Sequence, residues 1–85
     1  MYNVGDYGLS GRNGISDYLG IIMETITDPS EVRYGDWQYQ GDCEFYVSDN
    51  NLTIIRSDGE WVSTFPLTEP GTIDYINSLP ILYKK

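Results

Sequence analysis

Apolar residues recur at helical spacing in one long segment near the N-terminus. In the stretch ISDYLGIIMETITDP they follow steps of three and four, at Ile15, Tyr18, Leu19, Ile22 and Ile26. This spacing predicts an amphipathic helix whose apolar side faces a core. Asn13 or Ser16 is suited to cap the helix. The pair Asp28-Pro29 is expected to end it, because the residue before proline disfavours the helical conformation.

After Pro29 the pattern changes to short runs rich in β-branched and aromatic residues. The runs are EVRY, WQYQ, CEFYV, LTIIR and EWVSTFPL, each followed by a turn signal. Such runs predict four or five antiparallel strands. The tail GTIDYINSLPILYKK predicts a short helical turn near residues 72–79, followed by an apolar stretch that Pro80 interrupts.

The pair Asp58-Gly59 is the strongest hairpin signal in the chain. A two-residue turn there sets the pairs Arg56–Trp61, Ile55–Val62, Ile54–Ser63, Thr53–Thr64 and Leu52–Phe65. Paired residues lie on the same side of a sheet, so Arg56 is expected to stack on Trp61 in a cation–π contact.

These elements predict an α+β fold. We expect a glycine-rich N-terminal loop over residues 1–14 and a single compact domain over residues 15–85. In that domain one amphipathic N-terminal helix packs on a four- to five-stranded antiparallel meander sheet, followed by a short C-terminal helical turn.

The charge narrows the classes of function. The chain has 13 acidic and 5 basic residues, giving a net charge of −8. A field of this sign repels nucleic acid at long range. It therefore favours a protein that presents an acidic surface to a basic partner. The other interpretation is a protein that acts on an anion through a small local basic site.

Missing residue types exclude several chemistries. The chain has no histidine and one cysteine, Cys43, which argues against an internal disulfide, a zinc site and histidine-dependent catalysis. We expect no cofactor and no metal. No run approaches the roughly 18 apolar residues of a membrane span, and the first 20 residues have no secretory pattern. We also expect a monomer.

Three arginines are the candidates for an anion site. Arg12 lies among glycines directly ahead of the predicted helix, whose N-terminus attracts anions. Arg33 and Arg56 lie on predicted strands. Each has a simpler interpretation: a solvated loop residue for Arg12, and a surface partner of Asp or Glu for the other two.

Hydroxyls and aromatic rings give weaker candidates. Thr64 is expected to pair with Thr53 across the hairpin, and Ser63 lies on the other side of the strand. The rings of Tyr34, Trp37, Tyr39 and Tyr46 form either core or a surface on which bases stack. Cys43 lies beside Asp42 and Glu44, which raises its pKa and argues against a nucleophile.

The segment GISDYLGIIMETITDPSEVR, the strand CEFYV, the hairpin LTIIRSDGEWVSTFPL and the turn IDYINSLP resemble a known family. They resemble the small toxin domains of bacterial competition systems in the barnase–EndoU–colicin–RelE-like ribonuclease group. The resemblance covers roughly residues 14–80. It implies metal-independent cleavage of RNA, often tRNA, in which the ribose 2′-hydroxyl attacks the phosphodiester and leaves a cyclic phosphate.

The resemblance also implies site residues and partners. Arg33 matches the arginine after the Asp-Pro stop, Thr64 the hydroxyl on the late strand, and Arg12 the basic position ahead of the helix. Arg56 and Tyr46 lie on neighbouring strands and complete the candidate site. The implied partners are an RNA substrate and a cognate immunity or carrier protein. The implied site of action is the cytoplasm, with delivery from a secreted parent protein.

Two hypotheses remain open at this stage, beside an unspecialised structural module. A ribonuclease toxin domain requires Arg12, Arg33 and Thr64 to converge in one cleft. The alternative is an acidic, non-enzymatic inhibitor or immunity protein that mimics nucleic acid for a basic partner. It requires a face of exposed carboxylates, formed by Asp36, Asp42, Glu44, Asp49, Asp58 and Glu60.

Overall fold

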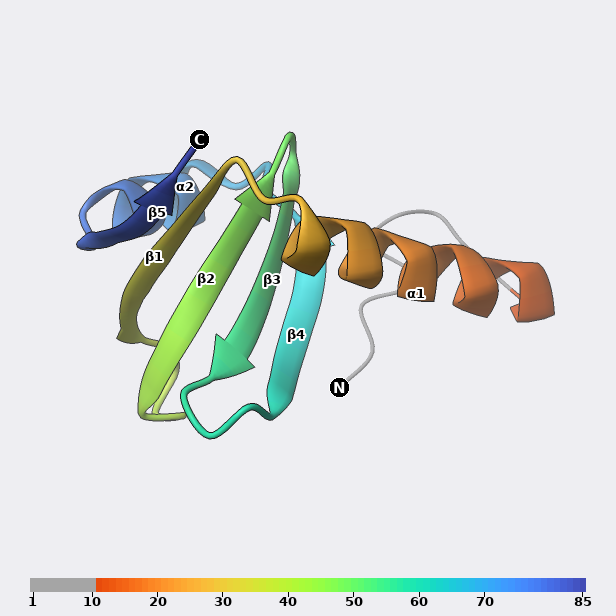
Figure 1. The fold of residues 1–85 in the computed structure, drawn as a ribbon, viewed down its shortest axis with the longest axis horizontal. Helices are drawn as coiled ribbons and strands as arrows, with labels where there is room; N and C mark the ends of the chain where they lie inside the picture. Colours follow the sequence, from red (N-terminus) through yellow and green to blue (C-terminus); the bar gives the residue numbers. More distant parts are fainter. Residues whose placement is uncertain (1–10) are drawn as a thin grey trace.

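The computed structural model describes residues 11–85, with side chains described from residue 17 onward. Its elements are α1 (Gly11–Thr27), β1 (Glu31–Asp36), β2 (Asp42–Ser48), β3 (Asn51–Arg56), β4 (Trp61–Pro66), α2 (Pro70–Asn77) and β5 (Ile81–Lys84) (Figure 1). Helix α1 begins four residues earlier than the expected Ile15 and includes Arg12 in its first turn. Residues 1–10 of the expected glycine-rich loop lie outside the described part.

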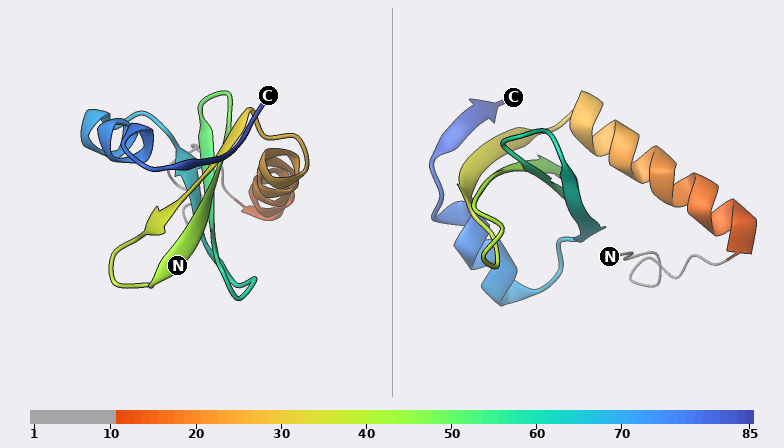
Figure 2. Two further views of the ribbon diagram at one scale, coloured as in Figure 1. Left: turned by 60° about the vertical axis from the view of Figure 1, so that its left-hand side comes forward. Right: turned by 90° about the horizontal axis from the view of Figure 1, so that it is seen from below.

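The five strands form one antiparallel sheet in the order β4-β3-β2-β1-β5. Figure 2 shows α1 and α2 on opposite sides of this sheet. The predicted α+β class, with an N-terminal helix packed on an antiparallel sheet, is confirmed. The second helix covers the other face and adds a third layer to the two that were expected.

Two assignments of strands differ from the sequence prediction. The run WQYQ, predicted as a strand, is the turn between β1 and β2, since β1 continues through Gly35 to Asp36. The fifth strand is β5, which follows α2 and pairs with β1 at the edge of the sheet. A Cβ on Gly35 would lie 2.6 Å from the Leu79 side chain. The glycine therefore allows the segment between α2 and β5 to pack closely against β1.

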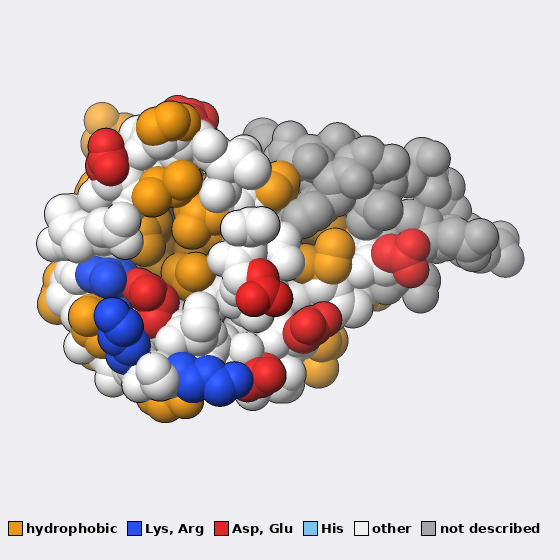
Figure 3. Space-filling model, turned by 90° about the horizontal axis from the view of Figure 1, so that it is seen from above, with side chains coloured by type: hydrophobic (Ala, Val, Ile, Leu, Met, Phe, Trp, Pro, Cys, Tyr) orange, Lys and Arg blue, Asp and Glu red, His pale blue; other side chains and the backbone are white. Residues whose placement is uncertain are grey.

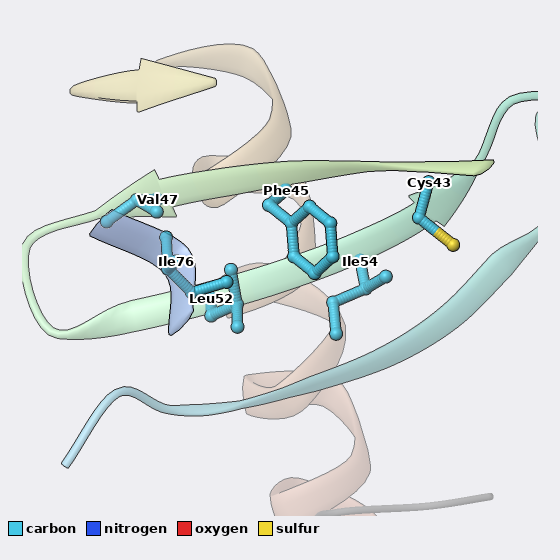
Figure 4. Packing of buried hydrophobic residues seen from close by; sticks show 6 residues of the cluster. All are labelled: Cys43, Phe45, Val47, Leu52, Ile54 and Ile76. Carbon is cyan, nitrogen blue, oxygen red and sulfur yellow. The ribbon is translucent and has the colours of Figure 1, made fainter. Parts of the chain in front are cut away.

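The main core lies between the sheet and α2. Its buried residues are Cys43, Phe45, Val47, Leu52, Ile54 and Ile76 (Figure 4). Phe45, Leu52 and Ile54 each have no exposed surface, and burial of such side chains contributes about 1.5–3 kcal/mol apiece. This side of the sheet is called the α2 face below.

The opposite side, the α1 face, has a smaller buried layer. The Tyr18 hydroxyl of α1 donates a hydrogen bond to the Thr64 carbonyl at 2.7 Å, and its ring meets Trp61 edge-on. Thr25 is fully buried. Leu19, expected to be in the core, is 55% exposed, so the inward side of α1 is set by Tyr18 and Thr25 instead.

The β3–β4 hairpin keeps most of the predicted pairs, including Thr53–Thr64 and Ile54–Ser63. Its loop has three residues, Ser57 to Gly59, because the Gly59 amide bonds the Arg56 carbonyl and Arg56 pairs with Glu60. A bulge between Ile54 and Ile55 restores the register.

Because of the bulge, Trp61 and Val62 lie on the opposite sides of the sheet from those predicted. Trp61 lies on the α1 face, where it meets Tyr18, and Val62 packs against the core of the α2 face. The predicted stacking of Arg56 on Trp61 is therefore wrong. Neither α1 nor α2 is long and apolar enough to cross a membrane.

Candidate functional site

Arg33 is a structural link between β1 and α2. Its side chain is buried and forms an ion pair with Glu31. Its Nη1 donates hydrogen bonds to the carbonyls of Asn77 at 3.1 Å and Leu79 at 2.8 Å. These carbonyls are at and just beyond the C-terminus of α2, where carbonyl groups lack partners within the helix. The guanidinium supplies these partners and fixes α2 against the sheet.

Thr64 lies on the other side of the sheet. Its hydroxyl shares a hydrogen bond of 2.9 Å with Thr53, as predicted, and accepts one of 3.0 Å from the Trp61 indole. Arg33 pairs with Phe45 on the α2 face, and Thr64 pairs with Thr53 on the α1 face. The structure therefore does not bring these two side chains together. The side chain of Arg12 lies outside the described part.

The other two candidates are both engaged by carboxylates. Arg56 is bound by Asp58 at 2.9 Å and by Glu60, and the hydrogen bond to Asp58 raises the pKa of the arginine. The Tyr46 hydroxyl donates to Glu44 at 2.8 Å. Partial burial makes the largest contribution and this hydrogen bond the next, and together they raise the pKa of Tyr46 to about 12. The Tyr46 phenol is therefore a poor proton donor at neutral pH.

One end of the sheet gathers carboxylates. The β1–β2 and β3–β4 turns lie side by side there (Figure 1), linked by a 3.0 Å hydrogen bond from the Ser57 amide to the Asp42 carbonyl. We call this region the acidic end. Its carboxylates are those of Asp36, Asp42, Glu44, Asp58 and Glu60, and its described cation is Arg56. Of the six carboxylates predicted to share a face, Asp49 is absent from it, because the β2–β3 turn is at the other end.

The carboxylates of the acidic end fall into two groups. Asp58 and Glu60 both form ion pairs with Arg56. Within the described part of the chain, Asp36, Asp42 and Glu44 form no ion pair. Asp36 and Asp42 are paired across the strands and exposed. The hydrogen bond to Asp42 raises the pKa of Tyr34, so the phenol stays protonated beside these carboxylates.

The opposite end of the sheet differs in charge. Lys84 and Lys85 lie there, and Lys85 binds Asp28 at 3.1 Å. Figure 3, which looks onto this end, shows Lys and Arg side chains gathered along one edge. The carboxylates of Asp28, Glu31 and Asp49 lie at this end as well, so both signs of charge occur there.

The segment between β1 and β2, whose Trp37 and Tyr39 are in the aromatic series named from the sequence, is a turn and not the predicted strand. The Gln40 amide bonds the Trp37 carbonyl at 2.7 Å, and Gln38 and Tyr39 between them both have positive φ, at 44° and 67°. Tyr39 is fully exposed, at 101%. The alternation of WQYQ resembles a strand, and the two central positions lack the glycine or asparagine that marks such a turn.

Two open cavities adjoin this turn. The larger, of about 500 Å³, is lined by Trp37, Gln38, Gln40, Val62, Ser63, Phe65, Glu69 and Thr72. The other, of about 440 Å³, is lined by Asp36, Trp37, Gln38, Tyr39 and Tyr75. Their linings combine aromatic rings with amide groups and one carboxylate each, Glu69 or Asp36, which disfavours a phosphate.

Cys43 is fully buried in the core. Burial, with a smaller contribution from the Asp36 carboxylate, raises the pKa of its thiol. This agrees with the expectation that Cys43 is no nucleophile. No group of three potential metal ligands occurs among the described side chains.

No protein-family model and no curated protein sequence matches the chain. Among solved structures, the fold is similar to a chain in a ribonuclease from Escherichia coli complexed with its inhibitor protein. The TM-score is 0.65 and the identity is 22%, over 87% of each chain. That complex contains two proteins, the ribonuclease and its inhibitor, and the likeness shows the fold alone. The chain thus shares its fold with a component of a bacterial ribonuclease–inhibitor complex.

Proposed function

We propose that this protein is an acidic inhibitor that binds a basic ribonuclease and has no catalytic activity of its own. The observation that carries the proposal is the state of the charged groups. The described candidate arginines are held by carboxylates, whereas Asp36, Asp42 and Glu44 are without ion pairs at one open end of the sheet.

The chemistry of ribonucleases explains why such a surface binds them. An enzyme that binds RNA neutralises phosphates with Lys and Arg in its cleft. A partner with carboxylates in a fixed arrangement complements that cleft and occupies it in place of RNA. Complementary charge also accelerates encounter, to as much as 10⁸–10⁹ M⁻¹s⁻¹ at low salt.

Inhibition of purified ribonucleases tests the proposal. The protein is added to a panel of basic, metal-independent bacterial ribonuclease domains in EDTA, including the enzyme of the Escherichia coli complex, and cleavage of a fluorescent RNA is followed. We expect stoichiometric inhibition of at least one enzyme, weakening as salt is raised. Failure to inhibit any of them contradicts the proposal.

A matched pair of double variants locates the effect. Asp36→Asn/Asp42→Asn removes two charges from the acidic end, and we expect the inhibition constant to rise about 10- to 100-fold. Asp17→Asn/Glu24→Gln removes two charges from exposed positions on α1 and should change it less than 3-fold. Equal effects would indicate that only the net charge matters.

A second candidate is the ribonuclease activity itself. It is supported by the resemblance of the sequence to ribonuclease toxin domains and by a fold shared with a component of a ribonuclease complex. In that case the 2′-hydroxyl of the RNA would attack the adjacent phosphodiester. Arg12, Arg33, Thr64, Arg56 and Tyr46 would be the residues to hold the phosphate and stabilise its charge.

The two candidates give opposite results with RNA alone. The purified protein is incubated with total bacterial RNA in EDTA, beside an Arg12→Ala variant and an Arg33→Ala/Thr64→Ala variant. The inhibitor proposal expects intact RNA with all three proteins. Discrete tRNA fragments with the wild type that disappear in the variants would favour the ribonuclease.

A further inference from the structure

We propose that the β1–β2 turn is the part of the acidic end that enters the RNA-binding cleft of the partner, with Tyr39 as its anchor. This inference rests on the proposed inhibitor function. The surface of the partner that receives the turn is a cleft with a site for an aromatic ring between cationic side chains.

The backbone of the turn is the first observation. Gln38 and Tyr39 both have positive φ, a region that residues with a side chain disfavour and that hairpin turns normally assign to Asn and Gly. Local strain of this kind persists where the surrounding structure enforces it, and it gathers at binding sites. The turn therefore retains a large aromatic residue at a position where glycine fits better.

The exposure of Tyr39 is the second observation. Tyr39 is 101% exposed, whereas Trp37, two residues earlier, is partly buried and packs against the rings of Phe45, Phe65 and Tyr75 at centroid distances of 6.0–6.3 Å. The turn is thus anchored at its base and presents a tyrosine at its tip. Tyrosine is enriched among residues that dominate binding energy, because it offers a large contact area with few rotatable bonds.

The charge at the base of the turn is the third observation. Asp36 ends β1 and Asp42 begins β2, and the two are paired across the strands, so two exposed carboxylates without an ion pair lie side by side beneath Tyr39. An exposed ring ahead of two adjacent carboxylates combines an aromatic surface with negative charge, as a nucleobase and its neighbouring phosphates do. Proteins that bind single-stranded RNA receive bases by stacking and phosphates by Lys and Arg. The cleft of a ribonuclease therefore complements this turn.

Variants of the turn test the inference against the ribonuclease domain that the wild-type protein inhibits. We expect Tyr39→Ala to weaken inhibition about 30-fold or more, as for a dominant interface residue. Tyr39→Phe should stay within 3-fold, because it retains the ring. Gln38→Asn/Tyr39→Gly removes the backbone strain and should weaken inhibition as much as Tyr39→Ala, although the fold remains intact.

Tyr83→Ala is the matched control. Tyr83 is an exposed tyrosine on β5, toward the other end of the sheet, and its removal should change inhibition less than 3-fold. Full inhibition by both Tyr39→Ala and Gln38→Asn/Tyr39→Gly overturns the inference and leaves the inhibitor function standing. An equal loss in Tyr83→Ala also overturns it. If the wild type inhibits no ribonuclease, the proposed function fails first and the inference falls with it.

Discussion

The β1–β2 and β3–β4 turns lie at the same end of the sheet, yet they differ in which residues adopt positive φ. In the β3–β4 turn the residue with positive φ is Gly59, and Asp58 accepts a 3.0 Å hydrogen bond from the Glu60 amide. In the β1–β2 turn the positive φ values before Gly41 belong to Gln38 and Tyr39. One turn agrees with local sequence preference, and the other opposes it.

The contrast extends to charge. Arg56 forms ion pairs with both carboxylates of the β3–β4 turn, whereas those beside the β1–β2 turn have no described ion pair. A turn that satisfies its own backbone and charges needs no partner. A turn that leaves strain, an exposed ring and carboxylates without an ion pair in place is the better candidate for contact with another molecule.

The largest expected effect concerns the base of the β1–β2 turn. Trp37→Ala removes a ring packed against Phe45, Phe65 and Tyr75, and should lower the free energy of unfolding by about 3 kcal/mol. Urea denaturation followed by circular dichroism measures the change. Tyr39→Ala, two residues away and exposed, should change stability by no more than about 0.5 kcal/mol. A loss below about 1 kcal/mol in Trp37→Ala would show that the turn is not anchored by this ring.

The next effect concerns the β3–β4 turn. Gly59→Ala places a side chain at φ +95°, and should cost about 1–2 kcal/mol of stability. A Cβ there has no neighbour within 4 Å, so the cost is that of the backbone alone. Gly20→Ala is the control, since Gly20 is exposed within α1 and has equally open space. It should stabilise by about 0.5–1 kcal/mol. Equal signs in the two variants would contradict the assigned backbone conformation.

A smaller effect of opposite sign is expected in the β1–β2 turn. Gln38→Asn/Tyr39→Gly relieves the strain of two residues but adds the conformational freedom of glycine to the unfolded chain. The net result should be a gain of about 1 kcal/mol, measured as a higher urea midpoint at unchanged slope. Together with a loss of inhibition, this gain would show that the turn sacrifices stability for binding. A loss of stability would contradict the inference that positive φ at Gln38 and Tyr39 strains the backbone.

Most of the fold could be predicted from the sequence. The helix up to Asp28 and the pairs Thr53–Thr64 and Ile54–Ser63 follow from periodicity and from the turn pair Asp58-Gly59. The β1–β2 turn could not be predicted, because WQYQ alternates as a strand does and contains no turn residue. The change of sides by Trp61 and Val62 follows from one extra residue in the loop, which residue preferences do not specify.

The candidate site was harder to predict from the sequence, because tertiary contacts decide which charged side chains are paired. Arg33 is engaged by carbonyls of Asn77 and Leu79, more than 40 positions away in the chain. Whether α2 lies on the same face as α1 or on the other decides this contact, and no local pattern fixes that choice. By contrast, the pairing of Arg56 with Asp58 and Glu60 is local, and the simpler interpretation of a surface ion pair was correct.

The smallest expected effect is the dependence of stability on acid in the β3–β4 turn. The hydrogen bond to Arg56, with one from the Glu60 amide, lowers the pKa of Asp58. Because the folded pKa is below the unfolded value of about 3.9, the stabilising contribution is present above that value. It is lost as the pH falls through the lowered folded pKa. We therefore expect Asp58→Asn to be less stable than wild type at pH 7, and the difference in stability to shrink as the pH falls through that lowered folded pKa. Thermal unfolding at several pH values measures this difference. A difference that persists unchanged at low pH would mean that Asp58 acts by shape and hydrogen bonding alone, so that the β3–β4 turn would owe its stability to backbone geometry and not to charge.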